Sequence, residues 1–197
     1  VDNFSVKVGD VLGYYTNTIS KLINNIVVIS NISNNYEIIR SLTAFVSFIN
    51  AKENAGQERA VLSNTFSADK FGDGIYNKFI ALVVAQNLYI EEFKKYVDPE
   101  ELINYNNITS GNKDFQEVER MRAVAMENAF TGGFETSGTY WFATITKKID
   151  ILKQIEDRLA ARLIKDIDQI RKSNIDVLVF SIGILAFAFI ATFGFSD

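Results

Sequence analysis

The sequence predicts an all-α protein, an antiparallel helical bundle whose long C-terminal helix continues into a transmembrane helix. Three observations predict this class. Apolar residues recur at helical spacing along most of the chain, strand-like alternation is scarce, and residues 177–195 carry no charge. We therefore expect a bundle over residues 1–143, a long helix over residues 144–176 that leads out of it, and a membrane span over residues 177–195.

The first half of the bundle divides at clusters of turn-forming residues. Helical periodicity predicts a first helix over residues 9–32, which an Asn-Ser cluster at residues 30–35 ends. A second helix follows over residues 36–65, and then a turn at residues 67–74, which contain Asp69, Gly72, Asp73 and Gly74.

The second half divides at proline and glycine. A third helix over residues 75–97 stops at Asp98-Pro99, because proline disfavours helix in the residue before it. Pro99 opens a short turn with Asp98 as its cap, and residues 104–112 are predicted as a loop. A fourth helix over residues 113–129 ends at Gly132-Gly133, and an aromatic connector fills residues 134–142.

The last predicted helix begins near Thr144 and meets no proline or glycine before residue 177. Its apolar positions follow a heptad spacing, and charged residues occupy the other faces. The stretch that follows, VLVFSIGILAFAFIATFGF, is long enough to cross a bilayer as a helix. The chain begins without methionine and stops just after this stretch, so we expect it to be part of a longer protein.

Composition excludes several classes of function. The chain has no cysteine and no histidine, which excludes disulfides, thiolate or imidazole metal sites and a Ser-His-Asp triad. A net charge of -4 argues against nucleic acid as a partner. No carboxylate pair or phosphate loop has a recognisable catalytic arrangement, so we expect no enzyme and no cofactor.

Basic residues occupy an unexpected face of the second helix. At about 100° per residue, Lys52, Gly56 and Arg59 share a stripe with Phe45 and Phe48, which should meet the core. Glu58 falls on the opposite side. A cation pointing inward needs an anion, and either an internal carboxylate or a bound ligand can supply it. Gly56 permits close approach of a helix or a ligand.

Two polar residues on other helices share this feature. Gln86 lies on the apolar face of the third helix, and Arg122 follows Phe115 and Val118 at helical spacing in the fourth. Each is a candidate ligand contact or a satisfied polar group in the core. Together they favour a small polar cavity inside a bundle.

Residues 51–60, AKENAGQERA, resemble the second signature of the nitrate- and nitrite-sensing (NIT) domain family. The similarity continues through Gln86 and Trp141 and covers most of residues 9–175. The resemblance implies an all-helical sensor that binds nitrate or nitrite between helices through arginines of two signatures. Arg59 matches one of these arginines, and the earlier Leu-Gln-x-Glu-Arg-Gly signature is absent from this chain.

The resemblance predicts the extracytoplasmic sensor region of a chemotaxis-type receptor in the inner membrane, acting as a homodimer. The predicted ligand contacts are Arg59, Lys52, Gly56, Gln86 and Arg122. The alternative is a membrane-anchored bundle with a structural, dimerisation or partner-docking role, in which these cations form internal ion pairs. A carboxylate beside Arg59 would favour that alternative.

Overall fold

Helices form the regular structure of the described chain. The computed structural model describes the backbone of residues 35–193 and the side chains of residues 35–173. This part contains five helices and no strand: α2 (Tyr36–Ala68), α3 (Ile75–Tyr96), α4 (Pro99–Thr109), α5 (Lys113–Glu127) and α6 (Gly138–Phe193). The all-α prediction is confirmed. The helix predicted over residues 9–32 lies outside the described residues.

Local capping explains where α2 starts and stops. The Asn35 side chain accepts hydrogen bonds from the amides of Glu37 and Ile38, which satisfies two donors that the first turn leaves free. The helix ends at Asp69, which adopts a left-handed conformation with φ 50°. The Asp69 carboxylate then accepts from the amides of Gly133 and Phe134, and so ties the end of α2 to the α5–α6 connector.

The loop predicted over residues 104–112 is wrong for residues 104–109, because α4 extends to Thr109. Asp98 caps this helix through the amide of Glu100, and Pro99 stands in the first turn, where its missing N–H costs nothing. Tyr105 is buried against Phe48 and Phe93. These tertiary contacts stabilise a segment whose own asparagine-rich sequence is a poor helix former.

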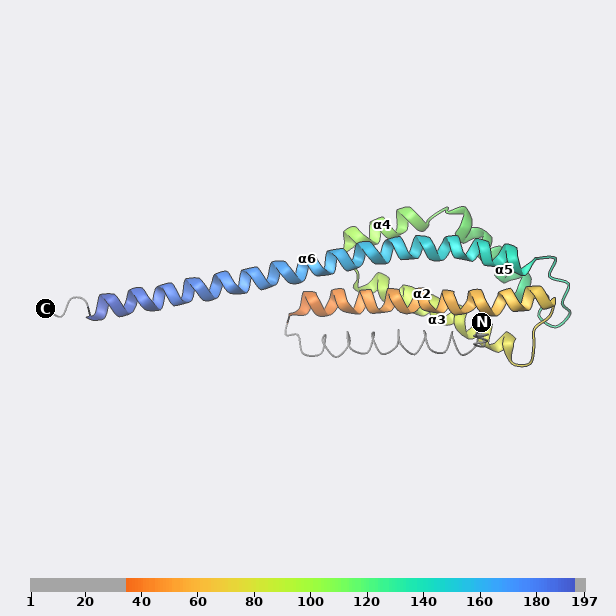
Figure 1. Cartoon of the computed structure of the whole chain (residues 1–197), viewed down its shortest axis with the longest axis horizontal. Helices are drawn as coiled ribbons and strands as arrows, with labels where there is room; N and C mark the ends of the chain where they lie inside the picture. The colour runs from red at the N-terminus through yellow and green to blue at the C-terminus, as the bar shows by residue number, and fades with distance from the viewer. Residues whose placement is uncertain (1–34, 194–197) are drawn as a thin grey trace, which may run out of the picture. The chain divides into compact units, whose positions relative to one another are not determined.

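The last helix begins at Gly138, six residues earlier than predicted. Ser137 accepts a hydrogen bond from the amide of Tyr140 and so starts the helix. Gly138 lies against α2, where a Cβ atom would come within 2.5 Å of the Ser63 carbonyl oxygen. From Gly138 to Leu159, α6 runs antiparallel to α2 (Figure 1). The predicted antiparallel bundle is confirmed.

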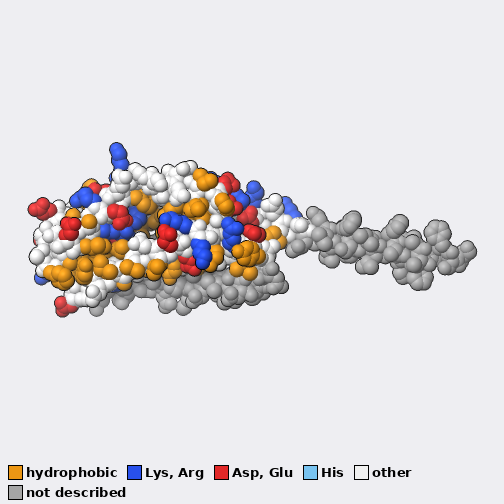
Figure 2. Space-filling model, turned by 180° about the vertical axis from the view of Figure 1, so that it is seen from behind, with side chains coloured by type: hydrophobic (Ala, Val, Ile, Leu, Met, Phe, Trp, Pro, Cys, Tyr) orange, Lys and Arg blue, Asp and Glu red, His pale blue; other side chains and the backbone are white. Residues whose placement is uncertain are grey.

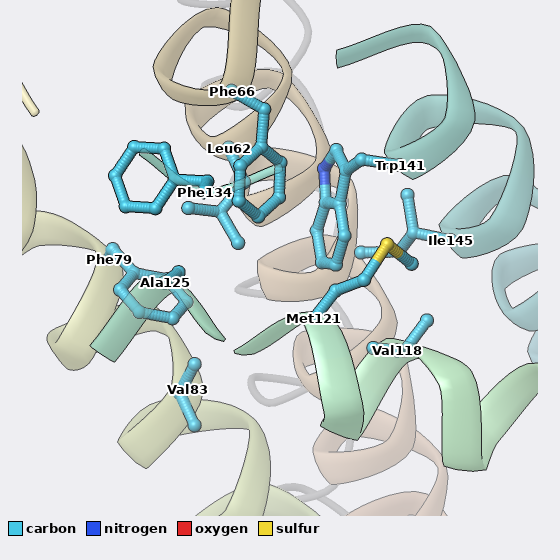
Figure 3. Packing of buried hydrophobic residues seen from close by; sticks show 10 residues of the cluster. All are labelled: Leu62, Phe66, Phe79, Val83, Val118, Met121, Ala125, Phe134, Trp141 and Ile145. Atoms are coloured by element: carbon cyan, nitrogen blue, oxygen red, sulfur yellow. The ribbon is translucent and has the colours of Figure 1, made fainter. Parts of the chain in front are cut away.

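Two apolar clusters form the core of this bundle. The first joins all helices except α4 and centres on Trp141 (Figure 3). The second joins α2, α3, α4 and α6 around Phe48 and Phe93. Along α2, α3 and α6 a buried polar residue lies between the two clusters; these residues are Glu58, Gln86 and Lys148. We call this level of the bundle the polar layer.

Contacts divide the chain into two compact units, Val1–Leu159 and Ala160–Asp197. The second unit contains the C-terminal part of α6, which includes an Arg162–Asp166 ion pair one turn apart. Among the described residues, no helix combines the length and the apolar character that crossing a bilayer requires. The span predicted at residues 177–195 lies outside the residues whose side chains are described, and it stays a prediction.

Candidate functional site

The residues AKENAGQERA occupy the middle of α2, but the face that they bury is not the predicted one. The buried positions are Ala51, Ala55 and Glu58, and Glu58 has no exposed surface. Lys52 and Arg59 lie at the flank and are partly exposed. The predicted stripe is therefore displaced by roughly a quarter turn around the helix. The prediction that Glu58 points away from the core is wrong.

Glu58 is buried because Arg122 neutralises it. The Arg122 Nε donates to Glu58 Oε1 at 2.7 Å, and Nη2 donates to Oε2 at 2.6 Å, which is a bidentate pair. Gln86 completes the arrangement, since it donates to Glu58 Oε2 at 2.8 Å and accepts from Arg122 Nη2 at 2.8 Å. A further Arg122 nitrogen, Nη1, donates to Glu119 at 2.6 Å. The polar layer thus carries a closed hydrogen-bond network.

The electrostatics of this network favour the charged form of Arg122. Burial alone lowers the pKa of Arg122, but hydrogen bonds and attraction from Glu58 outweigh it and the pKa is raised. Glu119 adds a smaller effect of the same sign. Arg122 and Gln86 are therefore committed to a carboxylate of the protein itself. These bonds are those of the structural alternative that the sequence left open, and a role of the two residues as ligand contacts stays a prediction.

Lys52 also has an internal partner. Its ammonium group forms an ion pair with Glu156 of α6, and both side chains are mostly buried. A single cation matched by one carboxylate leaves no unpaired charge for a ligand at this position. The Lys52–Glu156 pair instead connects α2 to α6 near the second apolar cluster.

Arg59 differs from the other predicted cations. Among the described residues no carboxylate pairs with it; its Nη1 donates to the Thr146 hydroxyl at 3.0 Å, and its guanidinium lies 4.7 Å from the centre of the Phe142 ring. The Trp141 indole donates to the Arg59 carbonyl oxygen at 3.1 Å. All three neighbours belong to α6. The carboxylate that would have favoured the structural alternative is not found beside this arginine in the described part.

The space beside Arg59 is open at Gly56. A Cβ atom placed on Gly56 would meet no heavy atom of the described residues within 4 Å. The described helices therefore do not pack closely on this glycine, and the approach of a ligand stays a prediction. Since Gly56 precedes Arg59 by one turn of α2, the two positions share one side of the helix.

The structure thus divides the five predicted residues into two groups. Gln86 and Arg122 lie in the polar layer, whereas Lys52, Gly56 and Arg59 lie along the flank of α2. Sequence reasoning missed Glu58, Thr146, Glu156 and Lys148. For Lys148 a signal existed, because it falls on the heptad-spaced stripe of α6 that is buried; its members are Trp141, Ile145, Lys148, Leu152, Ile155 and Leu159.

Comparison with known proteins assigns the family. The model of the NIT family, described as nitrate and nitrite sensing, matches residues 1–164. The chain belongs to the NIT family. The nitrate regulatory protein of Klebsiella oxytoca is 22% identical over 156 residues, which cover 79% of this chain and 39% of that protein. No solved structure gives a significant match.

The resemblance of residues 51–60 to a NIT signature is therefore confirmed at the level of the family. A NIT domain is a sensor domain, and Arg59 is the arginine of its signature that has no carboxylate partner among the described residues. Among the described residues no group of three acidic side chains could hold a metal ion. Acidic and basic side chains are interspersed on the face shown in Figure 2, which carries no extended basic patch.

Proposed function

We propose that this NIT domain senses nitrate, nitrite or a similar small anion through Arg59, as part of a chemotaxis-type receptor in the inner membrane. In this proposal residues 35–159 lie outside the cytoplasm, the receptor is a homodimer, and the last helix passes the signal through a membrane span. The observation that carries the proposal is a signature arginine without a carboxylate partner in the described part of the chain.

The surroundings of Arg59 suit a planar oxyanion. One N–H group of the guanidinium is used by Thr146, and the others are available for the parallel hydrogen bonds that a planar anion accepts. Phe142 presents its ring to the cation without neutralising it. Gly56 leaves room on the same side of α2. An anion here would therefore gain a charged hydrogen bond without breaking an ion pair.

The same contacts offer a route for the signal. The Arg59 side chain holds Thr146 of α6, while its carbonyl oxygen is held by Trp141, which is fully buried. An anion that draws the guanidinium away from Thr146 and Phe142 would change the contact of α2 with α6 next to this fixed point. Such a ligand shifts the equilibrium only by its difference in affinity for the two arrangements. We expect a slide of about 1–2 Å.

The test is a titration of nitrate and of nitrite into the complete native protein, followed by calorimetry and by thermal unfolding. Wild-type protein should release or absorb heat and should be stabilised by about 2.7 kcal/mol at a hundred times the dissociation constant. Arg59→Ala should bind at least tenfold more weakly, since a hydrogen bond to a charged group contributes about 1.5–3 kcal/mol. Arg59→Lys keeps the charge but loses the planar fork, so it should bind with intermediate affinity.

Arg120→Ala is the matched control. Arg120 is exposed and pairs with Glu117 one turn away, so its removal should leave anion binding unchanged. If neither anion binds the wild-type protein, or if Arg59→Ala and Arg120→Ala bind equally well, the proposal is wrong.

A further inference from the structure

A cavity of about 210 Å³ opens beside the polar layer and is separate from the flank that carries Arg59. Ala51, Gln86, Arg122, Lys148, Tyr105 and Leu152 are buried at its floor, while Asn87, Glu91 and Glu119 are exposed at its mouth. Its volume is several times the roughly 30 Å³ that one molecule occupies in liquid water. The cavity can therefore admit a small organic molecule from solvent.

Lys148 is the unusual group in this wall. Its side chain is 7% exposed, yet its ammonium has no hydrogen bond or ion pair among the described residues. The ring of Phe115 lies 5.4 Å from the nitrogen, and Glu58 and Glu119 attract the ammonium at longer range. Burial removes part of the water that solvates an ammonium, and no direct hydrogen bond from the described residues replaces it here, which disfavours the charged form.

Every other charged group of the wall already has a partner. Lys94 pairs with Glu91 at 2.8 Å, and Glu119 pairs with Arg122 at 2.6 Å. Arg122 is also held by the buried Glu58 carboxylate. Arg122 therefore contacts two carboxylates, Glu58 and Glu119, which also balance the charge of Lys148 at longer range. What the Lys148 ammonium lacks among the described residues is a direct hydrogen-bond acceptor, and a ligand bound in the cavity would supply one.

We propose that this cavity is a second ligand site, which binds a small monovalent carboxylate with a short alkyl chain through Lys148. The carboxylate oxygens would accept hydrogen bonds from the ammonium, which has no direct acceptor among the described residues. Apolar wall residues lie within the same cavity and would receive the alkyl end; they are Ala51, Ile90, Phe115 and Leu152. An inorganic anion such as nitrate would leave these apolar walls without contact, so the site should prefer the carboxylate.

The charge state of Lys148 gives the site a distinct signature. Burial, and then repulsion from Arg122, lower the pKa of Lys148 to about 8, while Glu58 and Glu119 act in the opposite sense. Binding a carboxylate favours the ammonium form, so complex formation at pH 8 should take up protons from the buffer. The charged or titratable groups around Lys148 are Glu58 of α2, Glu91 and Lys94 of α3, Tyr105 of α4, and Glu119 and Arg122 of α5.

The experiment titrates acetate, propionate and nitrate separately into the whole chain by calorimetry at pH 8, in two buffers of different ionisation enthalpy. We expect propionate and acetate to bind more tightly than nitrate and to take up protons. Lys148→Met should weaken carboxylate binding at least tenfold and abolish the proton uptake. Lys147→Met should behave as wild type, since Lys147 is exposed beside it.

Proton uptake separates this site from the one under Proposed function, because it should depend on Lys148. Three results would overturn the proposal: no binding of either carboxylate, binding and proton uptake that Lys148→Met leaves intact, or nitrate bound at Lys148 as tightly as propionate. Retained folding of each variant is checked by circular dichroism.

Discussion

Glu58 and Arg122, 64 residues apart in the chain, form a bidentate ion pair that has almost no exposed surface. Each charge is stabilised mainly by the other and by Gln86, and Arg122 also pairs with Glu119. Removing one partner would therefore leave a poorly compensated charge in the core, whereas removing both would remove the two charges together.

We predict that Glu58→Gln lowers the free energy of unfolding by about 3–5 kcal/mol, which urea denaturation measures. Glu117→Gln is the control, since its pair with Arg120 lies at the surface and contributes at most about 1 kcal/mol. The double variant Glu58→Leu/Arg122→Met should regain most of the loss. A double variant as unstable as the sum of the single ones would show that the two residues are not energetically coupled.

Lys148 should make stability depend on pH in the alkaline range. The pKa in the folded protein is about 8 and the ordinary value is 10.5, so the unfolded chain binds more protons between these values. The free energy of unfolding should therefore rise as pH increases from about 8 to about 10.5. Below pH 8 the Lys148 ammonium lowers the free energy of unfolding.

We expect Lys148→Met to stabilise the protein at pH 7 by roughly 3 kcal/mol, and to have little effect at pH 10.5. Thermal unfolding at several pH values measures this, with Lys147→Met as the exposed control. A Lys148→Met variant that is less stable than wild type at pH 7 would contradict the prediction, because it would mean that the ammonium has a stabilising partner.

Gly138 and Gly56, which both lie in helices, should respond in opposite ways to alanine. A methyl group on Gly138 would collide with the backbone of α2 at Ser63, so Gly138→Ala should separate the two helices at a cost of about 1–3 kcal/mol. Gly56→Ala meets no neighbour and should stabilise α2 by about 0.5–1 kcal/mol. Equal effects in urea denaturation would show that the close approach at Gly138 does not determine stability.

Thr146 should restrain the response of Arg59 to an anion. Thr146→Val keeps the shape of the side chain but removes the oxygen that accepts from Arg59. If an anion competes with this hydroxyl, the variant should bind nitrate or nitrite about fivefold more tightly, since a typical hydrogen bond contributes about 1 kcal/mol. Weaker binding in the variant would mean that Thr146 supports the bound state instead.

The movement of α6 relative to α2 on anion binding can be measured directly. The chain has no cysteine, so spin labels can be placed at Asn64 of α2 and Lys153 of α6, which are both exposed. Electron–electron distance measurements should show a change of about 1–2 Å on anion binding in wild type and a smaller one in Thr146→Val. An unchanged distance in wild type would exclude the slide.

Helix periodicity and capping predicted most elements of the fold. The bounds of α2, α3 and α5 were predicted to within a few residues, because asparagine, glycine and proline end each of them. The part of α4 after residue 103 was predicted as a loop. The local sequence does not show what stabilises the helix there, which is the packing of Tyr105 and the Glu101–Arg158 ion pair. Contacts of this kind join residues far apart in sequence.

The candidate site was predicted less well, for a reason that lies in α2. The buried face of the helix uses the small residues Ala44, Ala51 and Ala55, which a search for large apolar side chains does not recognise. A charged residue such as Glu58 is read as exposed unless its partner is known, and Arg122 is on a distant helix. Arg59 was identified through its motif, and only the three-dimensional structure shows that no carboxylate of the described residues pairs with it.

The mutual dependence of Glu58 and Arg122 also limits how this family can diverge. A lineage that replaces one of them passes through an unstable intermediate unless the second replacement follows closely, whereas exchange of both together is nearly neutral. The two positions should therefore be inherited as a unit, present together or lost together, even where the surrounding sequence has drifted beyond recognition.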